Sequence, residues 1–381
     1  MGWTKKWGII NLLTLTSGFL LNACATNADL SLITIGLSQN FTDASTLNQF
    51  KTALLSQIIE LKTNHSQFKQ VELKDLHIVS IEDEATKIQD LNTNKIQFGF
   101  VSAFAVFQSR VQNFQIALQT KTDAFIGDQT IAFYATENNP LATIATRLNE
   151  NFQNPSYKTW SDSTNPKGWN GFRYQKNYVE PAQTIPYYRG MIMIYGNETE
   201  RTQIRTAWNN KDWNAFKKFG IMSGNLDSAG RYWLQAELLK KHFGPNQFTS
   251  LAELAKTDPD FLFLSGQKGE NIGATNLAKY HIVFDDAGSY AWTKSNTNNS
   301  QIFAYTPADT TKQTEIFMVT DPLPYDLGIF SAQVPQLTQD LVVQAILNLQ
   351  ANDPYGPSYG YNGYEAANSD FLNQFRHNYG F

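Results

Sequence analysis

The chain has 381 residues, of which 42% are hydrophobic and 17% are charged, enough for two globular domains that each bury a core. Its 30 lysines and arginines are scattered along the sequence, and its formal net charge at pH 7 is -4. This pattern excludes the broad basic surface that nucleic-acid binding needs, so we expect no nucleic-acid partner.

The N-terminal segment is typical of a secreted lipoprotein. Two lysines precede an apolar run over residues 7–21, which is short for a membrane-spanning helix. The sequence Leu-Asn-Ala-Cys at residues 21–24 resembles the bacterial lipobox, in which the cysteine becomes the lipid-modified first residue. Cys24 is the only cysteine, so no intramolecular disulfide is possible. We expect residues 1–23 to be a signal peptide and Cys24 to anchor the mature protein to the outer face of the cell membrane.

The first half of the mature chain alternates strands and helices. A buried strand over residues 32–38 precedes an amphipathic helix whose apolar residues recur at three- and four-residue spacing from Leu47 to Leu61. Strands over 77–81 and 96–101 follow, separated by a short helix. This β-α-β-α-β order predicts an α/β fold with a largely parallel sheet and helices on both faces.

Ligands of such sheets bind beyond the carboxyl ends of the strands, which selects two candidate positions. Ser38 ends the first strand, and Ser102 and Ala103 follow the third. Ser102 and Ala103 also begin a helix, where free backbone N–H groups favour an anion.

A second helix start, in residues 221–232, is the element on which the functional prediction depends. A short buried strand leads into a turn of small residues, and Ser228, Ala229 and Gly230 open the next helix. Their N–H groups and the helix dipole form a candidate anion site. The same sequence is also typical of an ordinary helix capped by Asp227 or Ser228.

The remaining sequence predicts further strands and helices around a proline-rich segment at residues 137–183. Strands are expected over residues 114–120, 130–136, 187–195, 261–264, 280–286, 315–320 and 327–330, and helices over 198–216, 337–349 and 369–377.

Catalytic motifs are not evident in the sequence. The five histidines are scattered, and none lies at metal-ligand spacing from another histidine or from the cysteine. We find no nucleophile elbow, phosphate loop or dinucleotide fingerprint. The pattern favours binding over catalysis, so we expect neither an enzyme nor a cofactor.

Seven short motifs, in this order, resemble those of the phosphonate-type periplasmic solute-binding proteins of ABC importers. They are IGLS (35–38), FGFVSAF (98–104), YYRG (187–190), DSAG (227–230), DDAGSY (285–290), TDPLPYD (320–326) and YNGY (361–364). With the lipobox and the asparagine, lysine and aromatic bias, the chain is most similar to the mycoplasma-type family of extracytoplasmic thiamine-binding lipoproteins.

This resemblance implies a type II periplasmic-binding-protein fold, in which a ligand cleft separates two α/β lobes. Lobe 1 would comprise residues 24–125 plus 321–381, and lobe 2 residues 126–320. The protein would be a lipid-anchored monomer that binds thiamine or a thiamine phosphate and delivers it to an ABC permease and its ATPase. The alternatives are an alkylphosphonate or phosphate-ester receptor, a surface adhesin on the same scaffold and, last, a hydrolase.

In the phosphonate binders the turn that corresponds to residues 228–230 receives the phosphoryl group. Asp227 and Ala229 depart from the usual Ser-Thr-Ser-Gly pattern, which favours thiamine pyrophosphate over a bare phosphonate. Its diphosphate is expected at the N–H groups of residues 228–230 and 102–103, with hydrogen bonds from Arg189 or Arg231. The rings are expected to lie against aromatic faces and carboxylates. The candidates are Tyr188, Tyr232, Tyr290, Trp292, Tyr325, Asp227 and Asp286.

Overall fold

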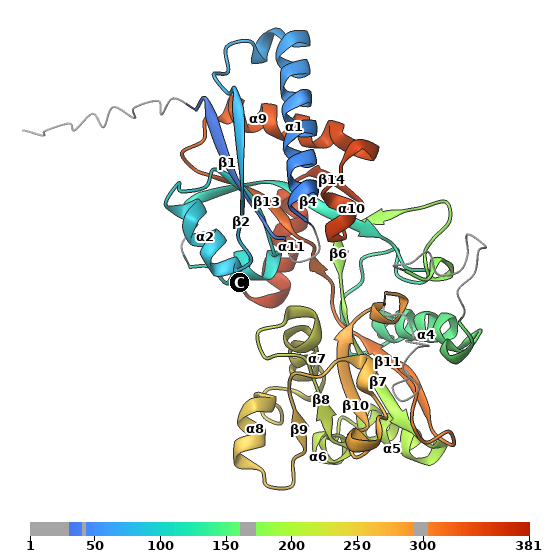
Figure 1. Cartoon of the computed structure of the whole chain (residues 1–381). Coiled ribbons are helices and arrows are strands. Elements are labelled where there is room, and N and C mark those ends of the chain that lie inside the picture. Colours follow the sequence, from blue (N-terminus) through green and yellow to red (C-terminus); the bar gives the residue numbers. More distant parts are fainter. Residues whose placement is uncertain (1–29, 40–42, 111, 161–172, 293–303) are drawn as a thin grey trace, which may run out of the picture.

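The computed structural model describes residues 30–39, 43–110, 112–160, 173–292 and 304–381. The predicted signal peptide and Cys24 lie outside these residues. Two sheets, each with its own helices, form two lobes, one above the other in Figure 1. All the buried core residues found in the described chain lie after residue 30, so a chain that begins at residue 25 contains every one of them.

The sheet of lobe 1 has the order β14-β4-β13-β3-β1-β2. Its strands are β1 (Leu32–Leu37), β2 (Asp75–Ser80), β3 (Phe98–Val101), β4 (Phe114–Asp123), β13 (Leu327–Ser331) and β14 (Gly363–Ala366). β1 pairs in parallel with β2 and β3, which confirms the predicted β-α-β-α-β unit. β13, β4 and β14 add antiparallel strands.

Helices cover both faces of this sheet. The helices α1 (Ala44–Asn64) and α9 (Gln336–Leu349) pack together on one face. The other face carries α2 (Glu84–Asn92), α3 (Ala103–Gln108) and α11 (Ser369–Tyr379), and α10 (Gly356–Tyr359) is a short helix near its edge. The predicted helix that became α1 begins after Asp43, whose side chain accepts a hydrogen bond from the Thr46 N–H at 2.7 Å.

The sheet of lobe 2 has the order β11-β7-β10-β8-β9. Its strands are β7 (Gly190–Gly196), β8 (Ile221–Met222), β9 (Phe263–Leu264), β10 (Ile282–Asp286) and β11 (Gln313–Val319). Its helices are α4 (Pro140–Gln153), α5 (Glu198–Asn209), α6 (Trp213–Phe216), α7 (Leu234–Phe243) and α8 (Leu251–Thr257).

A short antiparallel ladder lies between the two sheets. It pairs β6 (Tyr187–Tyr188) with β12 (Leu323–Pro324), and each strand leads directly from one sheet to the other. β5 (Thr184–Ile185) pairs with β4 of lobe 1, although the predicted division assigns it to lobe 2. The predicted division into residues 24–125 plus 321–381 and residues 126–320 therefore stays a prediction.

The strand predicted over residues 130–136 is wrong. The carbonyl groups of Thr130 and Ala132 accept hydrogen bonds from the Arg189 guanidinium, and the Tyr134 N–H donates to the Asp321 carboxylate. Side chains of distant residues thus take the backbone groups that a neighbouring strand would otherwise bind.

Candidate functional site

At the start of the helix over residues 229–243, the first N–H groups have no hydrogen-bond acceptor among the described residues. The first hydrogen bond of this helix joins the Trp233 N–H to the Ser228 carbonyl at 3.0 Å, which is the spacing of the π-helical turn Ala229–Trp233. The N–H groups of residues 229–232 therefore have no acceptor within the helix. Ser228 occupies the N-cap position, which is one of the two predicted residues, although its side chain makes no capping hydrogen bond.

Gly230, of the DSAG motif, lies against residues of the YYRG and DDAGSY motifs. A Cβ atom at this position would lie 1.8 Å from Asp286 Oδ1 and 3.2 Å from Tyr188 Cε2, so only glycine allows this close approach. Arg231 Nε lies 3.8 Å from Asp286 Oδ2. Tyr188, Asp286 and Arg231 thus surround the helix start.

Asp286 is partly accessible, and its pKa is well above that of an ordinary aspartate. Its side chain is 33% exposed. Burial, then the charge of Asp285, raises the pKa of Asp286 to about 7, and Arg231 opposes the shift. Burial also raises the pKa of Asp285, but Asp285 accepts hydrogen bonds from the Ser289 hydroxyl (2.6 Å), the Tyr305 hydroxyl (3.1 Å) and the Gly269 N–H (3.0 Å). The Asp286 carboxyl group therefore combines partial exposure with a raised pKa.

The wall that lobe 1 contributes holds two carboxyl groups, of which Glu84 is paired with Lys87. Glu84 accepts hydrogen bonds from the Ser102 N–H at 2.8 Å and from Lys87 Nζ at 2.7 Å. Lys87 Nζ also donates to Ser38 Oγ at 2.9 Å and to the Phe100 carbonyl at 3.0 Å. The Ser102 N–H therefore already has an anionic partner in lobe 1, and the expectation that Ser102 and Ala103 bind a phosphate stays a prediction.

Tyrosine rings and a second carboxyl group complete this wall. The Tyr361 hydroxyl donates to Asp326 Oδ2 at 2.7 Å, and Tyr325 lies with ring centroids 5.8 Å from both Tyr361 and Tyr188. Burial, together with the charge of Glu84, raises the pKa of Asp326 to about 6. Burial, then the charges of Asp286 and Asp326, raises the pKa of Tyr188.

The lobes touch beside this group of residues. The Trp233 ring, in lobe 2, lies 4.8 Å from the rings of both Phe104 and Tyr379 in lobe 1. Ala103 and Ala229 belong to the same apolar cluster. We call the residues that face one another here, Glu84, Tyr188, residues 228–231, Asp286, Tyr325, Asp326 and Tyr361, the interlobe site.

Several predicted site residues lie elsewhere. Arg189 is 1% exposed, and its guanidinium binds Asp128 and three backbone carbonyls, so it stabilises the fold. Tyr290 is buried in the core of lobe 2 with its ring 5.1 Å from Phe152. These two predictions are wrong because both side chains point into lobe 2.

The other predicted residues lie at the surface or against the core. Trp292 is 46% exposed and donates its indole N–H to the Tyr178 hydroxyl at 2.6 Å. Tyr232 packs against the core of lobe 2, and Asp227 is exposed. The sequence prediction missed Glu84, Asp326 and Tyr361, although the last two belong to motifs that it named.

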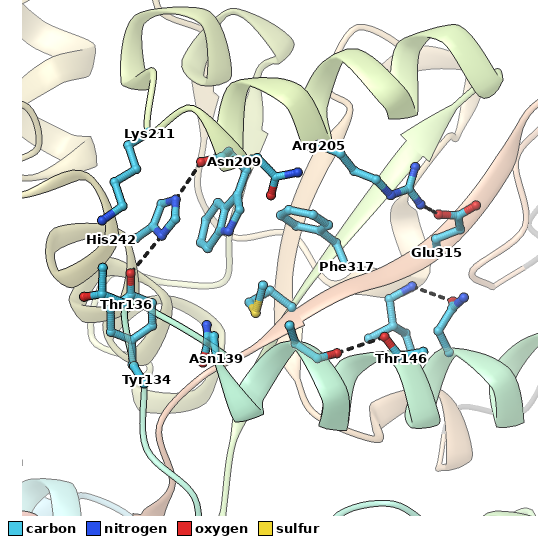
Figure 2. A pocket seen from close by; sticks show the side chains of 16 residues that line it. Tyr134, Thr136, Asn139, Thr146, Arg205, Asn209, Lys211, His242, Glu315 and Phe317 are labelled. Carbon is cyan, nitrogen blue, oxygen red and sulfur yellow. Dashed lines mark hydrogen bonds and ion pairs between the residues drawn. The ribbon is translucent and has the colours of Figure 1, made fainter.

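A separate cavity of about 490 Å³ lies in lobe 2 between α4 and α5 (Figure 2). Two sets of the polar groups that face it bind one another. Arg205 pairs with Glu315, and His242 lies between the Tyr134 hydroxyl (3.0 Å) and the Trp208 carbonyl (2.8 Å). None of the predicted site residues lines it. Within the described ranges we find no cluster of three or more metal-ligating side chains, and no helix there is long and apolar enough to span a bilayer.

Two α/β lobes that meet at a short ladder, with charged and aromatic side chains facing each other between them, define a solute-binding protein. Residues 48–380 match the family described as extracytoplasmic thiamine-binding lipoprotein, and the chain belongs to this family. Among its relatives is the high affinity transport system protein p37 of Mycoplasma pneumoniae, 34% identical over 345 residues that cover 86% of this chain and 88% of that protein. Protein p37 of Mesomycoplasma hyorhinis is also 34% identical, over 84% of this chain and 79% of its own length.

A solved structure has the same fold. Mycoplasma hyorhinis Mh-p37, described as a proposed thiamine pyrophosphate transporter, superposes with a TM-score of 0.78 at 30% identity, covering 91% of this chain and 98% of its own. The family consists of transport proteins rather than enzymes. The predicted fold, family and role as an extracytoplasmic solute-binding component that works with a permease are confirmed.

Proposed function

We propose that this protein captures thiamine diphosphate, or thiamine and its monophosphate, outside the cell and delivers it to an ABC permease and its ATPase. It does so as a monomer held by a lipid on Cys24. The proposal rests on the observation that the N–H groups of residues 229–232 lie opposite a wall of carboxyl groups and tyrosine rings. A ligand with an anionic end and a cationic ring matches these two surfaces.

The diphosphate would bind at the helix start in lobe 2. The free N–H groups of the π-helical turn and the helix dipole favour an anion there, and the Arg231 guanidinium adds a charge-assisted hydrogen bond. Asp286 is compatible with a phosphate because its pKa is about 7. In its protonated form it donates a hydrogen bond to a phosphate oxygen.

The cationic thiazolium would lie against lobe 1. Tyr188 and Tyr325 are partly exposed and supply ring faces that attract a cation. The carboxyl group of Asp326 adds negative charge, and the buried Tyr361 holds it through a hydrogen bond. A methylphosphonate has no cationic part, so this wall gives it no partner and disfavours the phosphonate receptor.

Lobe closure would bring the two halves of this site together. The β6 and β12 strands join the sheets through a ladder of two residue pairs, which is a suitable hinge. The closed state would exclude water from the ligand, and an ATP-driven permease would reopen it.

Calorimetry on the chain that begins at residue 25 tests this function. We expect thiamine diphosphate to bind, and methylphosphonate and inorganic pyrophosphate to bind at least a hundredfold more weakly. Ser228→Leu places a bulky side chain at the free N–H groups and should abolish binding. The matched control is Ser250→Leu, because Ser250 also occupies an N-cap position without a side-chain hydrogen bond. If Ser228→Leu binds as tightly as the control, this helix start is not part of the site.

A further inference from the structure

We propose that one end of lobe 1 lies on the membrane and binds anionic phospholipid headgroups. A groove of about 530 Å³ runs along the C-terminal half of α1. Three lysines and three apolar residues line it, namely Lys62, Lys69, Lys74, Leu55, Ile59 and Leu73. We call it the lysine groove.

The lysine groove carries positive charge that no carboxylate in its lining neutralises. Lys69 and Lys74 are exposed and make no ion pair with any described residue. Lys62 Nζ donates a hydrogen bond to the Leu73 carbonyl at 2.8 Å, which leaves its charge unpaired. Of the acidic neighbours, Asp75 pairs with Lys51 at 3.0 Å.

Two further acidic residues, Glu60 and Glu72, are exposed beside the lysine groove but do not line it. They reduce the net charge of this end of lobe 1 without occupying the groove. The unpaired ammonium groups therefore favour a phosphate group small enough to enter the groove. A flat anionic surface would be bound less well.

Apolar side chains accompany this charge. Ile59 is 58% exposed, more than the other large apolar side chains of the described chain, and Leu32 at the start of β1 is 46% exposed. Exposed apolar residues beside lysines suit the boundary between headgroups and acyl chains, where the apolar part is buried and the ammonium groups meet phosphates.

The proposed lipid anchor, on which this inference rests, sets the distance to the bilayer. The Ser31 carbonyl accepts hydrogen bonds from the N–H groups of Lys74 (2.8 Å) and Asp75 (3.1 Å), so the described chain starts beside the lysine groove. The six steps of chain from Cys24 to Leu30 would span at most ~22 Å if fully extended. Figure 1 places the start of β1 and the C-terminal end of α1 at the end of lobe 1 that points away from lobe 2.

Binding to vesicles by the chain that begins at residue 25 tests this inference without the lipid. The vesicles contain equal parts of phosphatidylglycerol and phosphatidylcholine, or phosphatidylcholine alone, and sedimentation is measured at low and high salt. Each lysine near an anionic surface changes partitioning about fivefold, which corresponds to ~1 kcal/mol. We therefore expect Lys69→Glu with Lys74→Glu to weaken binding to the anionic vesicles about 25-fold or more.

The matched control carries Lys211→Glu and Lys218→Glu, which change the net charge equally on exposed residues of lobe 2. We expect this control to bind the anionic vesicles as the parent chain does, and salt to weaken both. If the parent chain binds both kinds of vesicle equally, the inference is wrong, and the groove could bind a protein instead. Equal losses of binding in the two double variants would also overturn the inference. Thiamine diphosphate binding, measured on the same samples, reports separately on the proposed function.

Discussion

Replacing Asp286 with asparagine tests which end of the ligand lies against this carboxyl group. The pKa of Asp286 is raised to about 7, so in the free protein the group is mostly neutral at pH 6 and mostly ionised at pH 8. A phosphate beside it binds only the protonated form well. Affinity should then fall about tenfold between pH 6 and pH 8, or ~1.4 kcal/mol, because the protonated fraction falls from about nine-tenths to about one-tenth over this range.

Calorimetry with thiamine diphosphate at pH 6 and pH 8 provides the assay, on the parent chain and on Asp286→Asn. The ionisation of the ligand itself affects both proteins equally and cancels in their ratio. We expect the variant, whose amide donates at every pH, to lack the tenfold loss. A parent affinity that instead rises with pH would place the cationic ring beside Asp286, and identical profiles would remove Asp286 from the site.

Two other substitutions separate binding from stability. Gly230→Ala places a Cβ atom 1.8 Å from Asp286 Oδ1 and should displace Asp286 and Tyr188, lowering thiamine diphosphate affinity at least tenfold in calorimetry; an unchanged affinity would show that this contact does not shape the site. Arg189→Ala leaves Asp128 buried without its partner and should lower the free energy of unfolding by about 3–5 kcal/mol in urea titrations, with little effect on the affinity of the folded protein. Loss of binding at unchanged stability would instead return Arg189 to the ligand site.

The architecture was predictable where the pattern is local. The apolar residues of α1 recur at helical spacing, and strands alternate with helices through the first half of lobe 1, so the parallel pairing of β1 with β2 and β3 followed. The start of the helix after β8 was also found, because small residues follow a short apolar strand. Its π-helical form was not, since no residue type specifies it.

The parts of the site that depend on distant contacts were not predictable. Glu84 lies 18 residues before Ser102, and only the fold brings its carboxylate to the N–H group that was expected to bind phosphate. Arg189 follows a tyrosine of the interlobe site, but successive residues of a strand point to opposite sides, and its partner Asp128 is 61 residues away.

Mass spectrometry of the small molecules released when the purified protein is denatured addresses the ligand itself. The chain that begins at residue 25 is expressed in a host that makes thiamine and purified without added ligand, with Ser228→Leu as the comparison. We expect thiamine diphosphate, or thiamine and its monophosphate, from the parent chain and none from the variant. A parent chain that releases no thiamine compound, and gives no heat when thiamine or either phosphate is added, would contradict the proposed function.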